Sequence, residues 1–262
     1  MALRSININA AGGNASVTSI DCGTSSPKLG GVIDVSAFPN LSDFRCIGHN
    51  VTEFKGMGNL KNVVTLNLSD NALTGSIPSL SVNTKLVDFY CFNNALTGSI
   101  PSLSANTALQ RFYCWSCSFT GSPPALPSRV TQFRCEDNQL TGSIPNFTSN
   151  TSLNAYFCHK NQLVGDIPDL SALQSLNQFF CHNNKLSGFS GGVPTGLGKF
   201  QAQNNQLTAS AVNALLAAFV AANRTSGDRI LNLAGSGNAA PTGQGLTDKT
   251  TLQQRGWTLQ TN

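Results

Sequence analysis

The stretch Leu86-Val-Asp-Phe-Tyr-Cys-Phe-Asn-Asn-Ala-Leu-Thr-Gly-Ser-Ile-Pro101 decides the fold. Closely similar stretches occupy residues 130–145 and 153–168. Such recurrence is typical of a protein built from one structural unit stacked on copies of itself. We number the positions of the unit one to sixteen, from Leu86 to Pro101.

Nine units can be followed through three of these positions, and consecutive units lie 21 to 24 residues apart. The sixth position is Cys22, Cys46, Leu68, Cys91, Cys114, Cys135, Cys158, Cys181 and Ala202. The fourth is Ile20, Phe44, Leu66, Phe89, Phe112, Phe133, Tyr156, Phe179 and Phe200. The ninth is Asn71, Asn94, Asn138, Asn161, Asn184 and Asn205, with Ser25, His49 and Cys117 as departures.

The fourth and sixth positions are apolar and alternate with the third, fifth and seventh. Side chains alternate between the two faces of a β-strand, so this pattern predicts one half-buried strand per unit. Stacked in register, these strands form a parallel sheet. The ninth-position amide can satisfy backbone groups where the chain turns away from the strand. The Leu-Thr-Gly-Ser-Ile-Pro segment then predicts an extended or turn-like return rather than a helix.

The unit resembles the leucine-rich repeat, whose consensus is Leu-x-x-Leu-x-Leu-x-x-Asn-x-Leu, over roughly residues 17–208. The Leu-Thr-Gly-Ser-Ile-Pro return looks like a subtype best known from plant receptors, and bacterial and phage proteins use the same repeat. The resemblance implies a leucine-rich repeat solenoid: a curved parallel β-sheet on the concave side and extended returns on the convex side. This sequence departs from the consensus with Phe at the fourth position and Cys at the sixth.

The segments flanking the repeats differ from them. Residues 1–16 are polar and predict either an arm for attachment or a loosely ordered cap. Val212, Leu215, Leu216, Phe219 and Val220 have the spacing of an amphipathic helix, capped by Thr208 or Ser210. The sequence predicts a strand at Ile230, a short helix over 248–255 and a last strand over 257–259. Residues 209–262 therefore form a C-terminal cap, which resembles the caps of bacterial and tailed-phage repeat proteins in its Ala-Ala-Pro-Thr-Gly and Gly-Trp-Thr segments.

Composition narrows the classes of function. Charged residues make up 11% and the net charge is +4, without a Lys/Arg run, so we expect no nucleic-acid partner. No apolar run is long enough to span a membrane, and the first residues lack the apolar core of a signal peptide. We also expect no enzymatic activity and no cofactor, because no catalytic triad, nucleotide loop or paired-carboxylate motif stands out.

The eight cysteines invite a metal or disulfide interpretation. Cys114-Trp-Ser-Cys117 has the spacing of a metal or redox pair, but no second pair lies nearby. His159 and His182 each follow a sixth-position Cys and must face the other way. We therefore expect no metal site, and we interpret the sixth-position Cys residues as small buried hydrophobes with free thiols.

The fifth and seventh positions point outward from the predicted sheet, on its expected concave side, which is here called the outer sheet face. Rings gather there over five consecutive units, and they either shield the sheet backbone or form a contact site. We favour a contact site, with Trp115 as its anchor. Ten residues are the candidate ligand-binding residues: Tyr90, Phe92, Tyr113, Trp115, Arg134, Glu136, Phe157, His159, Phe180 and His182.

These observations predict a non-enzymatic module that binds a protein or carbohydrate ligand. Its expected place is the surface of a phage particle, as a tail or capsid decoration protein assembled in the host cytoplasm, with the N-terminal arm contacting other virion proteins. A bacterial adhesin or effector, at the cell surface or outside the cell, is the alternative. An enzyme subunit is a third and weaker one.

Overall fold

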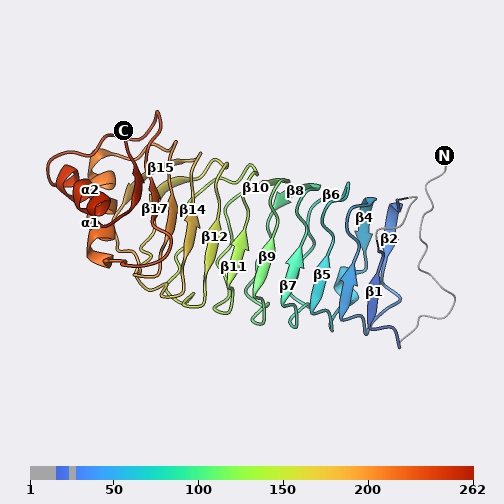
Figure 1. The fold of residues 1–262 in the computed structure, drawn as a ribbon. Helices are drawn as coiled ribbons and strands as arrows, with labels where there is room; N and C mark the ends of the chain where they lie inside the picture. The colour runs from blue at the N-terminus through green and yellow to red at the C-terminus, as the bar shows by residue number, and fades with distance from the viewer. Residues whose placement is uncertain (1–15, 24–27) are drawn as a thin grey trace. The chain divides into compact units, whose positions relative to one another are not determined.

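The computed structural model describes residues 16–23 and 28–262. The predicted arm over 1–16 therefore lies almost entirely outside the described residues. The chain divides into two compact units, Met1–Thr120 and Gly121–Asn262, each described below by itself. These are called the first and second unit, as distinct from the repeat units that they contain. Figure 1 shows that each unit consists of successive turns of chain, with one strand of each turn aligned beside the next.

The main sheet of the first unit is parallel and follows chain order. Its strands are β1 (Ser19–Asp21), β3 (Asp43–Arg45), β5 (Thr65–Asn67), β7 (Asp88–Tyr90) and β9 (Arg111–Tyr113). Fourth-position residues pair directly with one another, as Phe44 does with Leu66 and Leu66 with Phe89. The predicted strand and register are therefore confirmed in every unit of this part.

The main sheet of the second unit continues beyond the repeats that the sequence pattern identifies. Its strands are β11 (Gln132–Arg134), β12 (Ala155–Phe157), β14 (Gln178–Phe180), β16 (Lys199–Gln201), β17 (Ile230–Asn232) and β18 (Thr258–Gln260). Phe200 pairs with Leu231, and Leu231 with Leu259. The C-terminal segment thus adds two strands to the same parallel sheet.

The returns are extended, as predicted, and several also pair into small parallel sheets. These sheets contain β2 (Gly30–Asp34) with β4 (Asn50–Lys55); β6 (Thr74–Gly75), β8 (Ala95–Ser99) and β10 (Ser118–Thr120); and β13 (Val164–Ile167) with β15 (Lys185–Phe189). One return differs, because it contains the 3₁₀ turn η1 (Met57–Asn59). Gly56 begins that turn with φ 91°, and the backbone of Ser36 lies too close for any side chain.

The core lies between the main sheet and the returns. Fourth-position rings stack on one another, as Phe89 does on Phe112 with centroids 5.0 Å apart and Tyr156 on Phe179 at 5.4 Å. Each such buried ring contributes about 1.5–3 kcal/mol of hydrophobic stabilisation. The sixth-position cysteines are buried beside these rings, except Cys22, which is half-buried rather than buried as predicted. All eight cysteines are free thiols in this structure.

Ninth-position asparagines satisfy the backbone of the turns, as predicted. Asn94 donates to the carbonyls of Leu68 and Cys91 and accepts from the Leu73 amide at 2.9 Å. The residue before it, Asn93, has φ 52°. The equivalent residue is also left-handed at Asp70, Ser116, Asp137, Lys160, Asn183 and Asn204. Asn and Asp adopt this conformation more readily than other side chains, which fits their frequency at the eighth position.

One further row of contacts, and the role of one ninth-position departure, were missed in the sequence. Asn83, Asn106 and Asn150 are at most 1% exposed and donate to carbonyls of the preceding turn. His49 replaces a ninth-position asparagine: its Nδ1 accepts from the Leu29 amide, and its Nε2 lies 2.9 Å from the Gly23 carbonyl oxygen. The asparagine row and the ninth-position row both follow the repeat, so the period itself carried the signal.

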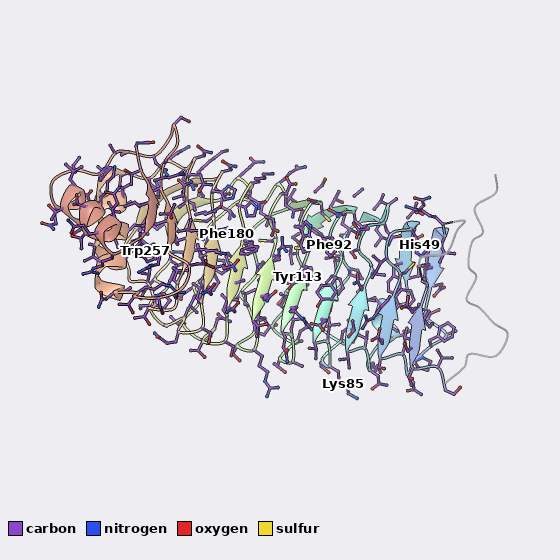
Figure 2. All side chains as sticks on the ribbon, in the orientation of Figure 1. His49, Lys85, Phe92, Tyr113, Phe180 and Trp257 are labelled. Atoms are coloured by element: carbon purple, nitrogen blue, oxygen red, sulfur yellow. The ribbon has the colours of Figure 1, made fainter. Side chains whose placement is uncertain are left out.

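The C-terminal segment contains the two predicted helices. In α1 (Ala209–Ala222) the Thr208 side chain accepts from the Ala211 amide and caps the helix. The predicted stripe is buried except Val220, which is half-buried at the helix edge. The second helix, α2 (Gln244–Gln254), begins four residues before the predicted 248, and the last strand is Thr258–Gln260 rather than 257–259, because Trp257 is buried just before it. Figure 2 shows Trp257 beside these helices.

Candidate functional site

The first unit places four candidate residues in one cluster on its outer sheet face. Tyr90 and Tyr113, at the fifth position of their repeats, end β7 and β9, and Phe92 and Trp115 follow at the seventh position. Figure 2 labels Phe92 and Tyr113. Phe92 and Trp115 stack with centroids 3.8 Å apart and planes 7° apart. Tyr90 and Tyr113 lie 4.8 Å apart, and Tyr113 lies 5.4 Å from Trp115. All four rings are half-buried, so they pack on each other and still present surface to solvent.

A charged pair adjoins these rings. Arg111 donates to both carboxylate oxygens of Asp88, at 2.6 and 2.7 Å, in the bidentate geometry that holds both groups firmly. Burial raises the pKa of Tyr90 to about 12, and the Asp88 charge adds to the shift, so Tyr90 keeps its proton at neutral pH. The cluster thus offers flat apolar rings beside a fixed guanidinium–carboxylate pair. Sequence reasoning missed this pair, although opposite charges stand at the third position of successive units.

The second unit places the other six candidate residues together on its own outer sheet face. Phe157 and Phe180 stack in parallel with centroids 4.4 Å apart, and the Arg134 guanidinium lies 5.0 Å from the centre of the Phe157 ring. His159 and His182 stack with centroids 4.3 Å apart. Each of these side chains is half-buried.

Glu136 does not lie at the surface as predicted: it is only 4% exposed. Arg134 donates to its Oε1 from both Nε and Nη2. The period-two pattern identified the correct face of the sheet but not the depth, because the bulk of the neighbouring side chains determines how far solvent reaches. Burial raises the Glu136 pKa, whereas the Arg134 charge opposes that shift.

The two histidines are held neutral by their surroundings. Burial lowers the pKa of His159 to about 4, and the charges of His182, Lys160 and Arg134 act in the same direction. Burial and the Lys160 charge also lower the pKa of His182. At neutral pH this part of the face therefore presents uncharged imidazoles.

Four buried polar atoms in this second cluster have no protein hydrogen-bond partner. They belong to seventh-position side chains of successive strands: Glu136 Oε2, His159 Nδ1, His182 Nδ1 and Gln203 Oε1. Buried polar groups are normally paired, and an unpaired one costs about 1–3 kcal/mol. Gln203 was not among the predicted site residues.

The remaining candidate chemistry is sparse in the part of the chain that the structure describes. No group of three or more His, Cys, Asp and Glu residues there is arranged to hold a metal ion. Cys117, of the Cys114-x-x-Cys117 pair, donates from its Sγ to the Cys91 carbonyl and replaces a ninth-position asparagine. Within the same described residues, no helix is long and apolar enough to cross a membrane.

Comparison with known proteins agrees with this architecture. The family model described as Leucine Rich Repeat matches residues 62–83, and no curated protein matches the sequence. The fold is similar to the Arabidopsis receptor kinase HAESA, solved with the peptide hormone IDA and the co-receptor SERK1, with TM-score 0.66 and 25% identity over 79% of this chain and 36% of that one.

Two further solved structures share the fold. The PEPR1–AtPEP1 structure gives TM-score 0.62 and 23% identity over 82% of this chain and 36% of the matched one. InlJ from Listeria monocytogenes, whose functional domain includes a cysteine ladder, gives TM-score 0.59 and 22% identity over 84% of this chain and 49% of the matched one. The chain thus spans half or less of each of these three matched chains. Its repeats and its parallel solenoid make it a leucine-rich repeat protein.

Proposed function

We propose that the protein is a non-enzymatic binding module that recognises a protein ligand on its outer sheet face. The observation that carries the proposal is the pairing of half-exposed rings on adjoining strands, above all Phe92 on Trp115 and Phe157 on Phe180. Aromatic rings are enriched in protein interfaces because they bury a large area with little loss of conformational freedom. HAESA, with the same fold, was solved with a peptide hormone, which supports a peptide or protein ligand here.

A carbohydrate is the second candidate ligand. The Arg111–Asp88 pair beside the ring cluster supports it, because it places hydrogen-bond donors and acceptors next to flat apolar rings, as sugar recognition requires.

The expected setting is the surface of a phage particle, where the module would contact host cells and the segment before residue 16 would contact other virion proteins. The low charge and the resemblance of residues 209–262 to phage repeat caps support this setting. A bacterial surface or secreted adhesin is the alternative. Mass spectrometry of purified virions from the source tests the virion setting: the protein should be found in the particles, and its absence from them contradicts that setting.

Substitution of Trp115 tests the binding face. Because central Trp residues contribute about 2 kcal/mol or more to an interface, Trp115→Ala should weaken attachment to host cells about thirtyfold. Tyr113→Ala should weaken it to a lesser degree. Val82→Ala is the matched control in the first unit, since Val82 is a 38% exposed apolar residue outside the ring cluster. Wild-type attachment by both ring variants would contradict the proposal.

A further variant distinguishes the two ligand classes. Trp257→Phe leaves Trp115 as the only tryptophan of the chain, so its fluorescence reports on the ring cluster. A glycan array and a peptide library derived from host surface proteins can then be screened for quenching. Quenching by peptides supports the protein ligand, and quenching by glycans alone supports the carbohydrate.

A further inference from the structure

The first unit contains a cavity of ≈ 330 Å³ that opens to solvent on one side, separate from the outer sheet face. One wall is formed by the buried side chains of Phe89 in β7 and of Leu68 and Cys91, which directly follow β5 and β7. The opposite wall comes from the returns and includes Met57, Leu73 and Leu96. Those six residues are at most 6% exposed.

The cavity lies where two kinds of return meet. The return that contains β4 and η1 lacks the Leu-Thr-Gly-Ser-Ile-Pro sequence, whereas the next return has it and forms β6. The lining includes residues of both, and the two returns do not fill the space between them.

Comparison with the same repeat position in the second unit shows that the looser packing is local. The eleventh position is Leu73 and Leu96 at the cavity, where these side chains are 4% and 6% exposed. The equivalent Leu163 and Leu186 of the second unit are 0% exposed. Well-packed cores leave few voids larger than a water molecule, so a cavity of this size departs from ordinary packing.

The mouth of the cavity is polar, unlike its walls. Glu53, Thr74 and Ser76 line it and are exposed, and the Glu53 carboxylate lies 3.5 Å from the Lys55 ammonium. A mostly apolar pocket with a few polar groups at one end is the usual form of a small-molecule site, and about 300–1,000 Å³ is the usual size. The carboxylate and the two hydroxyls can accept a hydrogen bond from a donor on the ligand.

We propose that this cavity binds a small apolar alcohol, with its hydrocarbon part between the sheet and the returns and its hydroxyl at the mouth. An apolar cavity of about 150 Å³ holds benzene, so one about twice that size accommodates roughly eight to ten carbon atoms. The site does not depend on the ring clusters, because its side chains point away from the outer sheet face.

Titration with octan-1-ol, followed through methyl NMR signals of the whole protein, tests the proposal. The methyl signals of Leu68, Leu73 and Leu96 should shift and saturate, while those of Leu163 and Leu186 stay in place. Octanoate, which has the same chain length but a charged head, should bind at least tenfold more weakly. Absence of saturable shifts in the first unit overturns the site, and equal affinity for octanoate overturns the alcohol assignment.

A variant that fills the cavity provides the second test. Phe119 occupies the eleventh position within the same unit and is fully buried, so the fold accommodates Phe there. Leu73→Phe should therefore raise the melting temperature and weaken octan-1-ol binding at least tenfold, and Leu96→Phe should do the same from the neighbouring turn. Val164→Phe, at a residue 45% exposed, is the control and should leave binding unchanged. Undiminished binding by a folded Leu73→Phe or Leu96→Phe protein overturns the site.

Discussion

At the scale of single residues, the solenoid depends on buried amides that close each turn. Asn161 donates to the carbonyls of Cys135 and Cys158 at 3.0 and 3.1 Å and accepts from the Leu140 amide at 2.9 Å. Asn161→Ala would leave these backbone groups unpaired in a dry interior. Because an unsatisfied buried group costs about 1–3 kcal/mol, we expect the free energy of unfolding to fall by about 3 kcal/mol.

Denaturant unfolding measures this loss. Asn154→Ala is the matched control, since Asn154 also donates to a backbone carbonyl, that of Ser175, but at an exposed position. The control should change the free energy of unfolding by at most about 0.5 kcal/mol. A loss no larger in Asn161→Ala than in the control would mean that the amide is not what closes the turn.

His159 makes the stability of the second unit depend on pH. Its pKa of about 4 lies below the ordinary value of 6.5, because of burial and the charges of His182, Lys160 and Arg134, with Asp137 opposing. Between these two values the unfolded chain binds a proton that the folded chain does not. The free energy of unfolding should therefore fall as the pH is lowered through this window, and the melting temperature should be lower at about pH 5 than at about pH 7.

A phenylalanine at the same position separates this effect from general acid sensitivity. His159→Phe keeps an aromatic ring beside His182 but cannot take up a proton. The fold accommodates Phe at this repeat position, since Phe92 occupies the seventh position of another repeat. Its melting temperature should fall less between the two pH values. Glu136 acts in the opposite direction, because its raised pKa favours proton uptake by the folded chain. An equal fall in melting temperature between the two pH values for the variant and the parent would exclude His159 as the cause.

At the scale of elements, the C-terminal helices cover residues that the last repeats leave apolar. Helix α1 packs against β15 and α2, and the Phe219 ring lies edge-on to Phe200 at 5.4 Å and to Trp257 at 5.1 Å. Deletion of residues 210–262 should uncover Phe200 and Leu207 and cause aggregation, which light scattering can follow. Thr208→Ala, which removes only the helix cap, should cost about 1 kcal/mol and leave the protein monomeric. A truncated chain that stays monomeric and unfolds cooperatively would show that the segment is not a cap.

The elements also show what the sequence can and cannot predict. The period-two alternation and the shared sixth position predicted every main-sheet strand of the nine repeats and its register, because a one-residue slip would turn the whole apolar set outward. The bounds of α2 were wrong by four residues, since nothing local marks its start: Gly243 precedes it without a side-chain cap. The continuation of the ninth-position row to Asn238, which accepts from the Leu207 amide at 3.0 Å, was missed because two extra residues separate it from its strand.

The candidate site was predictable in place but not in depth. The pattern put all ten residues on the outer sheet face, and the structure gathers four of them in one unit and six in the other. It did not indicate that Glu136 is buried or that Arg111 and Asp88 form a pair. Neither did it indicate the cavity near Leu73, since a void depends on how two adjacent returns fit, and the departure of one return from the repeat sequence does not say how it packs on the next.

At the scale of the whole molecule, the cysteines recur throughout the repeats, and their reactivity should follow burial rather than position in the chain. Cys91, Cys135, Cys158 and Cys181 are 0% exposed, and burial raises the pKa of each thiol. Thiols react as thiolates, so these should be inert in the folded protein. Cys22 is half-buried, and a hydrogen bond from the Cys46 thiol lowers its pKa.

Titration with a chromogenic disulfide reagent at about pH 8 measures this order, because the reagent reports the thiolate fraction at each exposed site. Cys22 should react first, and Cys117 should follow slowly, because burial raises its pKa to about 11. The other six should react only after denaturation. Cys22→Ser should remove the fast phase alone, and Cys117→Ser the slow one.

Neighbouring parallel strands hold their Cβ atoms about 4.8 Å apart, farther than the about 3.8 Å that a disulfide requires, so the sixth-position row should stay reduced. A native mass lower by two hydrogens for each pair of cysteines would contradict this prediction and show that the row is cross-linked.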